Sequence, residues 1–186
     1  IRDCLLSRGL GDVYKRQTKG LKTNISYTIY TNLHTNTAYS SLAAQITKIF
    51  PITLNTFIIP TIYGRFIFNN GIPFMYSNVI GGEGYNPHYE QQIPFSGLTH
   101  TESTLKLLGN AQIQVRHKFH EKQYLTLSGN YAIHQNQFSN FLQGKKIYGT
   151  SIGYGYDSPL GPIEGFICYS NRTNKLGFYL NIGFGF

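Results

Sequence analysis

Long apolar runs are missing from this sequence of 186 residues. No stretch approaches the roughly eighteen consecutive apolar residues that a membrane-spanning helix needs, which excludes a helical membrane protein. Charged residues make up only 13% of the chain, and helical periodicity is hard to find because alanine and leucine are sparse. Such a composition is unusual for a soluble domain. The other structure that can cross a bilayer is a closed β-barrel, in which neighbouring strands satisfy every backbone polar group.

Methionine is also nearly absent, since the chain begins at Ile1 and its single methionine is Met75. Residues 1–17, which read IRDCLLSRGLGDVYKRQ, share no periodicity with the rest of the chain. This segment resembles the translated sequencing-adapter read-through that heads many reading frames from metagenomic data. We therefore expect residues 1–17 to be a non-native leader and residues 18–186 to be the domain. A short amphipathic helix is the alternative for the leader.

Cysteine is scarce, and setting the leader aside leaves Cys168 alone because Cys4 belongs to the leader. A single thiol excludes an intrachain disulfide and a cysteine metal site, so Cys168 is expected to be a small residue of the barrel wall. Without the leader, the 16 basic and 8 acidic residues of the chain become 12 and 6, a net charge of +6. No basic run is longer than Lys145–Lys146, which favours a solvated face over nucleic-acid binding.

Strict alternation of apolar and polar residues is what the sequence does contain, most clearly over residues 175–186. The apolar residues of this segment are Leu176, Phe178, Leu180, Ile182, Phe184 and Phe186. The residues between them are small or polar. Because successive side chains of a strand point to opposite faces, the segment predicts a strand with one apolar face along its whole length.

Three earlier segments, 107–119, 124–133 and 147–156, show the same alternation. Their polar side is too polar for a protein core, so the apolar side is expected to meet lipid instead of a second sheet. Each segment has about ten residues, the length that a tilted strand needs to span a bilayer. In the first segment, the residues expected to face lipid include Ile113 and Val115, and those expected to face the lumen are Gln112, Gln114 and Arg116.

Four looser patterns complete the strands, at residues 25–33, 39–49, 54–68 and 163–171. The third of these is apolar on both faces, and Pro60 inside it requires a bulge or an unpaired donor site. Together the segments predict an all-β fold, an antiparallel transmembrane β-barrel fragment of about eight strands.

The longest connection, residues 69–104, lies on the side of the sheet where the connections are longer, as outer-membrane barrels require. We expect it to fold back into the barrel interior, because it is rich in aromatic residues and has few charges. An acidic residue of the loop would then pair with Arg116 or Lys118. The residues expected to make the inward contacts are Glu83, Tyr85, Tyr89, Glu90, Arg116 and Lys118. A flexible surface loop is the alternative.

Several stretches resemble known barrel families. Residues 153–163, which read GYGYDSPLGPI, resemble the penultimate hairpin of the superfamily that includes the outer-membrane assembly factors and the bacterial surface antigens. The end of the chain resembles the signal by which the barrel-assembly machinery recognises its substrates, here Phe178, Leu180, Ile182, Phe184 and Phe186. More narrowly, residues 81–186 resemble the barrel end of bacterial patatin-like phospholipases, in the stretches 81–83, 90–95, 124–131, 144–149 and 170–179.

This resemblance implies a barrel of about sixteen strands that follows a periplasmic patatin domain, with this chain as its carboxyl-terminal half. It implies a bacterial outer-membrane location and, as partners, outer-membrane lipid, the barrel-assembly machinery, and the missing amino-terminal strands and patatin domain. A homodimer stays open, and neither a cofactor nor nucleic acid is expected. The superfamily's long loop carries arginine, glycine and an aromatic at its tip, whereas residues 84–89 read GYNPHY. A latch by that arginine is therefore not expected.

Two catalytic patterns lack their structural context. Patatins use a Gly-x-Ser-x-Gly elbow, and residues 149–153 read GTSIG, but an elbow needs a strand, a sharp turn and a helix, whereas the alternation here is unbroken. Ser151 is therefore expected to face the lumen without a catalytic role. His117 and His120 are three residues apart, with Glu121 next in the chain, and could suggest a metal site. They flank a short turn and lack a plausible third protein ligand, so no metal site is expected.

Three function classes follow from the strand pattern and from what these resemblances imply. The first, which we expect, is a barrel that anchors or exports a patatin-like phospholipase domain. The second is a surface-antigen or assembly-factor barrel that inserts or translocates proteins or lipids, and the third is an independent eight-stranded structural or adhesive barrel. The fragment itself is expected not to be an enzyme, although its full-length parent would be a lipid acyl hydrolase in the first class.

Overall fold

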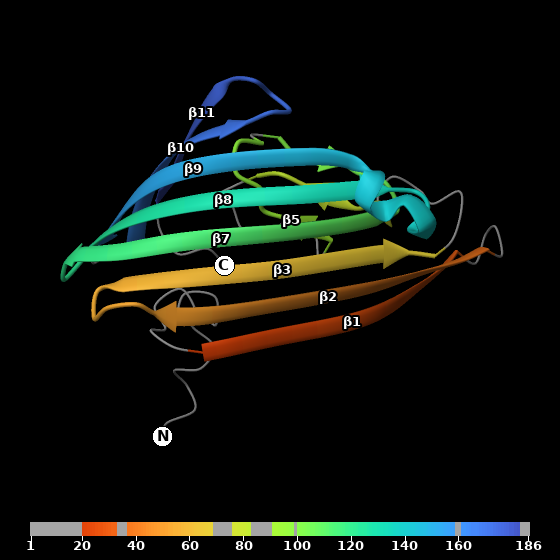
Figure 1. The fold of residues 1–186 in the computed structure, drawn as a ribbon, viewed down its shortest axis with the longest axis horizontal. Helices are drawn as coiled ribbons and strands as arrows, with labels where there is room; N and C mark the ends of the chain where they lie inside the picture. The colour runs from red at the N-terminus through yellow and green to blue at the C-terminus, as the bar shows by residue number, and fades with distance from the viewer. Residues whose placement is uncertain are drawn as a thin grey trace.

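One antiparallel sheet dominates the computed structural model, which describes residues 20–32, 37–68, 76–82, 91–98, 100–158 and 161–182. The strands of the sheet follow each other in chain order, from β1 at one edge to β11 at the other (Figure 1). They are β1 (Gly20–Asn32), β2 (Thr37–Pro51), β3 (Thr56–Ile67), β7 (Leu107–His120), β8 (Gln123–Gln135), β9 (Lys145–Ser158), β10 (Gly161–Ser170) and β11 (Leu176–Ile182). The predicted all-β fragment is confirmed, with strand ends that differ from the predicted ones by a few residues.

The sheet is open. Within the described ranges, β1 and β11 lie at opposite edges of the 8-stranded sheet and do not pair with each other. Figure 1 shows the strands side by side as one curved wall. The described strands therefore form an open wall, consistent with a fragment of a β-barrel.

The connections differ at the two ends of the sheet. At one end the turns are short, as at Glu121–Lys122 between β7 and β8. At the other end lie the long connection between β3 and β7 and the 3-10 helix η3 (Phe138–Gln143) between β8 and β9, which the sequence did not predict. No helix in the described part of the chain is long and apolar enough to cross a membrane. The end with longer connections corresponds to the extracellular side of outer-membrane barrels.

The two faces of the sheet have the predicted character. We define the outer face as the side to which Ile113 points, with 57% of its surface exposed, and the inner face as the opposite side. Further exposed apolar residues of the outer face are Leu125, Leu127, Tyr131, Tyr148, Ile152, Tyr154, Ile167, Leu176, Phe178, Leu180 and Ile182. Val115 pairs with Leu127, so it belongs to the same face, whereas Gln112 pairs with the buried Asn130. The predicted division of Ile113 and Val115 from Gln112, Gln114 and Arg116 between the two faces is confirmed.

Pro60 interrupts the pairing of β2 with β3. The pairing runs from Ser41 opposite Ile67 to Thr47 opposite Thr61, stops, and resumes with Phe50 opposite Ile58 in the same register. Of the two expected solutions, the structure thus uses an unpaired donor site and not a bulge, because proline has no N–H to give. The inner side chains of β3 near this break, Phe57 and Ile59, are buried with Ile49, which accounts for the apolar character of both faces.

The long connection contains a second, 3-stranded sheet made of β4 (Val79–Ile80), β5 (Gln92–Ile93) and β6 (Glu102–Ser103). We name residues 76–82 and 91–98 of this connection the inward segment. Its fully buried side chains include Ile80 and Phe95, which form one apolar cluster with wall residues. The wall residues of the cluster are Leu108, Ala132 and Ile147. The predicted return of the loop to the inner face is confirmed for these residues.

The backbone of the inward segment approaches the wall too closely for a side chain at two positions. Gly97 has a φ of 82°, and a Cβ atom there would overlap the carbonyl group of Tyr169 in β10. A Cβ atom on Gly149 in β9 would overlap the carbonyl oxygen of Ser96. Glycine at both positions therefore allows the segment and the wall to be in backbone contact.

We predict that Gly97→Ala destabilises the folded chain by about 2 kcal/mol or more, because it adds a strained left-handed residue and a clash with backbone. Urea titration of the chain refolded in lipid vesicles measures the free energy of unfolding. Gly129→Ala in β8 is the matched control, since no atom lies within 4 Å of a Cβ there, and its effect should stay within about 0.5 kcal/mol. Equal effects of the two variants would contradict the backbone contact.

Candidate functional site on the luminal wall

Three serine hydroxyls join the inward segment to the wall. Ser96 contacts Ser128 in β8 at 3.0 Å and Ser151 in β9 at 3.4 Å, between the hydroxyl oxygens. Ser128 and Ser151 are also hydrogen-bonded to each other across the two strands. All three side chains are buried. Because a hydroxyl donates one hydrogen bond and accepts others, the cluster satisfies buried polar atoms without any charge.

This cluster also explains the Gly-x-Ser-x-Gly pattern at residues 149–153. Ser151 lies in the middle of β9 on the inner face, as the unbroken alternation predicts. Gly149 admits the Ser96 carbonyl, and a Cβ atom on Gly153 would overlap the ring of Phe166. All three motif residues thus have a packing role in a continuous strand, and the strand–turn–helix geometry of a nucleophile elbow is not formed.

Two more wall residues hold the inward segment. The Tyr179 hydroxyl of β11 donates to the Leu98 carbonyl at 2.7 Å. The Asn130 amide of β8 satisfies both its atoms when its oxygen accepts from the Ser96 N–H at 3.2 Å. Contacts therefore reach the segment from β8, β9 and β11, and Gly97 adds the approach to β10. Four neighbouring strands near the carboxyl end of the chain thus share the docking surface.

A buried arginine holds the beginning of the inward segment. Arg65 in β3, only 3% exposed, donates to the Asn78 side-chain oxygen at 2.8 Å and to the Ser41 hydroxyl at 3.3 Å. Asn78 donates in turn to the carbonyls of Leu105 and Lys106 at 2.8 and 2.9 Å. The sequence pattern did not predict this pair, although Arg65 is the one charged residue of the apolar stretch 54–68 and is unusual there for that reason.

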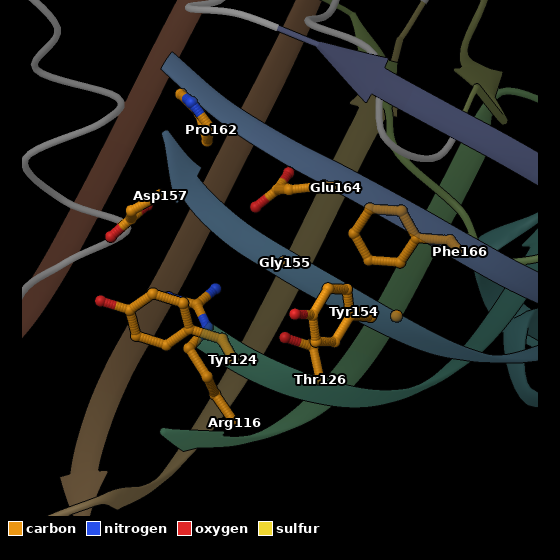
Figure 2. Close-up of a pocket in the computed structure, with 10 residues that line it drawn as sticks. Arg116, Tyr124, Thr126, Tyr154, Gly155, Asp157, Pro162, Glu164 and Phe166 are labelled. Atoms are coloured by element: carbon orange, nitrogen blue, oxygen red, sulfur yellow. The ribbon is translucent and has the colours of Figure 1, made fainter. Parts of the chain in front are cut away.

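A small pocket lies on the inner face nearer the short turns. Figure 2 shows Arg116 and Tyr124 on one side of it and Glu164 and Phe166 on the other, with Gly155 between them. Glycine in β9 leaves room for these side chains of β7, β8 and β10 to meet. The negative charges of Glu164 and Asp157 act on the Arg116 guanidinium. With about 40 Å³ the pocket is far smaller than a site for a small-molecule ligand.

The predicted loop contacts are brought together only in part. Arg116 points into the pocket just described. Lys118 is half-buried beside the β2–β3 turn, where its backbone N–H donates to the Asn55 carbonyl at 2.7 Å. Their expected loop partners, Glu83, Tyr85, Tyr89 and Glu90, lie outside the described residues. Glu102, a further acidic residue of residues 69–104 that was not among the predicted contacts, forms an ion pair with Arg172 at 3.0 Å.

The predicted assembly signal is described over its first half. Phe178, Leu180 and Ile182 all point outward from β11, with 67%, 53% and 68% of their surfaces exposed. Phe184 and Phe186 lie outside the described residues. The apolar outer face of β11 is thus observed, while its recognition by assembly machinery stays a prediction.

The histidines near the β7–β8 turn have local partners. The His117 ring is 2.9 Å from the Thr56 hydroxyl, and the His120 ring is 3.1 Å from the Phe119 carbonyl. Within the described ranges, no three His, Cys, Asp or Glu side chains lie together as metal ligands would.

The family of the chain follows from its wall, its inward segment and a comparison with protein families. The family model of the OMP85 superfamily matches residues 12–186, which cover the whole described sheet and also the last residues of the expected leader. A comparison with curated proteins finds no match for the chain. A meander with a long inward loop before its last five strands, matched over nearly the full sequence, identifies the chain as a member of the OMP85 superfamily of outer-membrane barrels.

Proposed function

We propose that this chain is the carboxyl-terminal half of an outer-membrane barrel that anchors or exports a patatin-like phospholipase domain. The observation that carries the proposal is the docking of the inward segment on β8 to β11. A segment held by backbone contact and buried hydroxyls covers the inner face of these strands. Such a barrel suits an anchor for an attached domain better than an open pore for diffusing solutes.

The resemblance of residues 81–186 to the barrel end of patatin-like phospholipases supports the identity of the attached domain. Two of the resembling stretches, 90–95 and 144–149, include residues that dock the segment, namely Phe95 and Gly149. The resemblance therefore includes positions at which the inward segment and the wall are in contact. In this proposal the ester chemistry belongs to the upstream domain and the wall contributes attachment to the membrane.

The second candidate is an assembly-factor or surface-antigen barrel that inserts or translocates proteins or lipids. The specific observation in its favour is the match to the OMP85 superfamily itself. Upstream sequence separates the two candidates, because the first requires a patatin domain and the second requires repeated periplasmic modules. A signal peptide directly before residue 18 would instead support an independent barrel.

Several partners belong to the same proposal. Glu83 or Glu90 would pair with Arg116 or Lys118 and add an ion pair to the neutral contacts that β8 to β11 make with the inward segment. The outward residues of β11 would be read by the barrel-assembly machinery. The remaining strands of the barrel would pair with the edges at β1 and β11, either from the same chain or from a second copy.

The upstream reading frame gives the first test. We expect it to encode a Gly-x-Ser-x-Gly elbow before a helix, followed by further alternating strands. The full-length product should sediment with outer membranes, and its phospholipase activity should disappear when that upstream serine is replaced. Repeated periplasmic modules in place of the elbow would overturn the first candidate and favour the second.

The second prediction concerns Ser151. Neither the purified chain nor its Ser151→Ala variant should hydrolyse a p-nitrophenyl ester or a phospholipid, because a serine in mid-strand has no activating base arranged as a nucleophile requires. We expect the variant to lose about 1 kcal/mol of stability from the hydroxyl cluster. Reproducible hydrolysis that is abolished by Ser151→Ala would refute this reading.

The third prediction is that chymotrypsin added to intact cells leaves the chain uncut between Tyr85 and Phe95. Phe95 is fully buried against the wall, so its peptide bond is out of reach of the protease. The loop with η3 is the internal control, since Phe138 and Leu142 are 60% and 76% exposed and should be cleaved. Rapid cleavage near Phe95 under conditions that also cut at Phe138 would exclude a docked segment.

A further inference from the structure

A groove crosses the outer face of the wall above Gly129. It has a volume of about 570 Å³ and is lined by apolar side chains of β7 to β11, including Ile113, Leu127, Ile152 and Leu176. Its floor is one row of paired residues that runs across the strands. In order, the row is Ile113, Gly129, Thr150, Tyr169 and Leu176. The two small members, Gly129 and Thr150, lie next to each other in this row.

Nothing within the described wall requires a glycine at position 129. Its φ is not in the left-handed region, and no atom lies within 4 Å of where a Cβ atom would be. Its neighbours on the same face of β8, Leu127 and Tyr131, are large and exposed. A glycine inside a strand weakens the strand and often marks a bulge, a tight bend, or the close approach of a ligand or another backbone. The missing side chain leaves room for an atom group from outside the protein.

Positive charge lies beside the extracellular end of the groove. Lys175 directly precedes Leu176, and Lys146 follows the outward row of β9 beyond Thr150 and Tyr148, with both lysines exposed. Among the described acidic residues, Glu102 is the one at this end of the sheet, and it forms an ion pair with Arg172. Glu121, Asp157 and Glu164 lie toward the short turns. An apolar groove below exposed lysines is complementary to a lipid with an anionic head group.

We propose that the groove over Gly129 binds one acyl chain of a phosphorylated lipid of the outer leaflet, with the phosphate held by Lys146 and Lys175. The inference needs the outer-membrane location of the chain but not the patatin domain. The groove supplies a fixed place for the acyl chain, and the lysines supply the preference for phosphate over a neutral or zwitterionic head group.

Native mass spectrometry of the full chain, released from detergent micelles with added lipid, tests the proposal. The probes are bis-phosphorylated lipid A and the zwitterionic phosphatidylethanolamine. We expect the wild-type chain to retain lipid A preferentially, and Gly129→Leu to weaken that retention about tenfold, the equivalent of about two buried methylene groups. The double change Lys146→Gln with Lys175→Gln should remove the preference for lipid A and leave the retention of phosphatidylethanolamine unchanged.

Gly165→Leu is the matched control, because Gly165 is also on the outer face but is not one of the residues that line the groove. A Cβ atom there makes ordinary contacts of 3.9 and 4.0 Å, so the variant should fold and bind lipid A like the wild type. Thr150→Leu fills the groove from β9 and replaces Gly129→Leu if the latter does not fold. Circular dichroism checks the strand content of every variant.

Three results would overturn the proposal. The first is equal retention of the two lipids by the wild-type chain, which removes the phosphate assignment. The second is unchanged lipid A retention in both Gly129→Leu and Thr150→Leu, which removes the groove. The third is a wild-type dimer that Gly129→Leu converts to a monomer without any effect on lipid, which makes the groove an interface between two copies.

Discussion

Backbone contact between the inward segment and β9–β10 is the constraint on which the luminal arrangement depends. Gly97 and Gly149 remove the two side chains that would separate the surfaces, and only then can the Ser96 hydroxyl reach Ser128 and Ser151. The apolar side chain of Phe95 packs beside this contact in one cluster with wall residues. Each hydrogen bond of a hydroxyl group contributes little free energy by itself. The segment is therefore held in place by the number and burial of these bonds and not by any one of them.

Sequence periodicity predicted the outer face well because lipid makes the same demand at every outward position. A single alternation therefore located the strands and the side to which Ile113 or Phe178 points. The inner face has no such uniform demand. The serine cluster joins positions 96, 128 and 151, and Arg116 interacts electrostatically with Glu164 and Asp157, so each partner is fixed by strand register and not by local pattern. The strands β4 to β6 have two residues each, too few for any periodic signal.

The elbow-like pattern at Ser151 illustrates how a motif can arise from packing. Glycine is needed at 149 for the Ser96 carbonyl and at 153 for the Phe166 ring, and a small hydroxyl at 151 fits between them. Two independent packing contacts thus require the two glycines that make the sequence match a catalytic motif. Family membership in the OMP85 superfamily and a continuous β9 agree with this view, since both make residues 149–153 part of a membrane wall.

The break in pairing at Pro60 makes the local stability of the sheet uneven. Elsewhere each strand is bound to its neighbours along most of its length, but Lys48 and Ile49 lack ladder partners on β3 while the register on both sides is unchanged. The amide protons of this short stretch should exchange with solvent sooner than those of β8 or β9, because local opening there breaks fewer hydrogen bonds. Stability in the sheet is therefore uneven, with a firm half from β7 to β11 that carries the inward segment and a softer seam between β2 and β3.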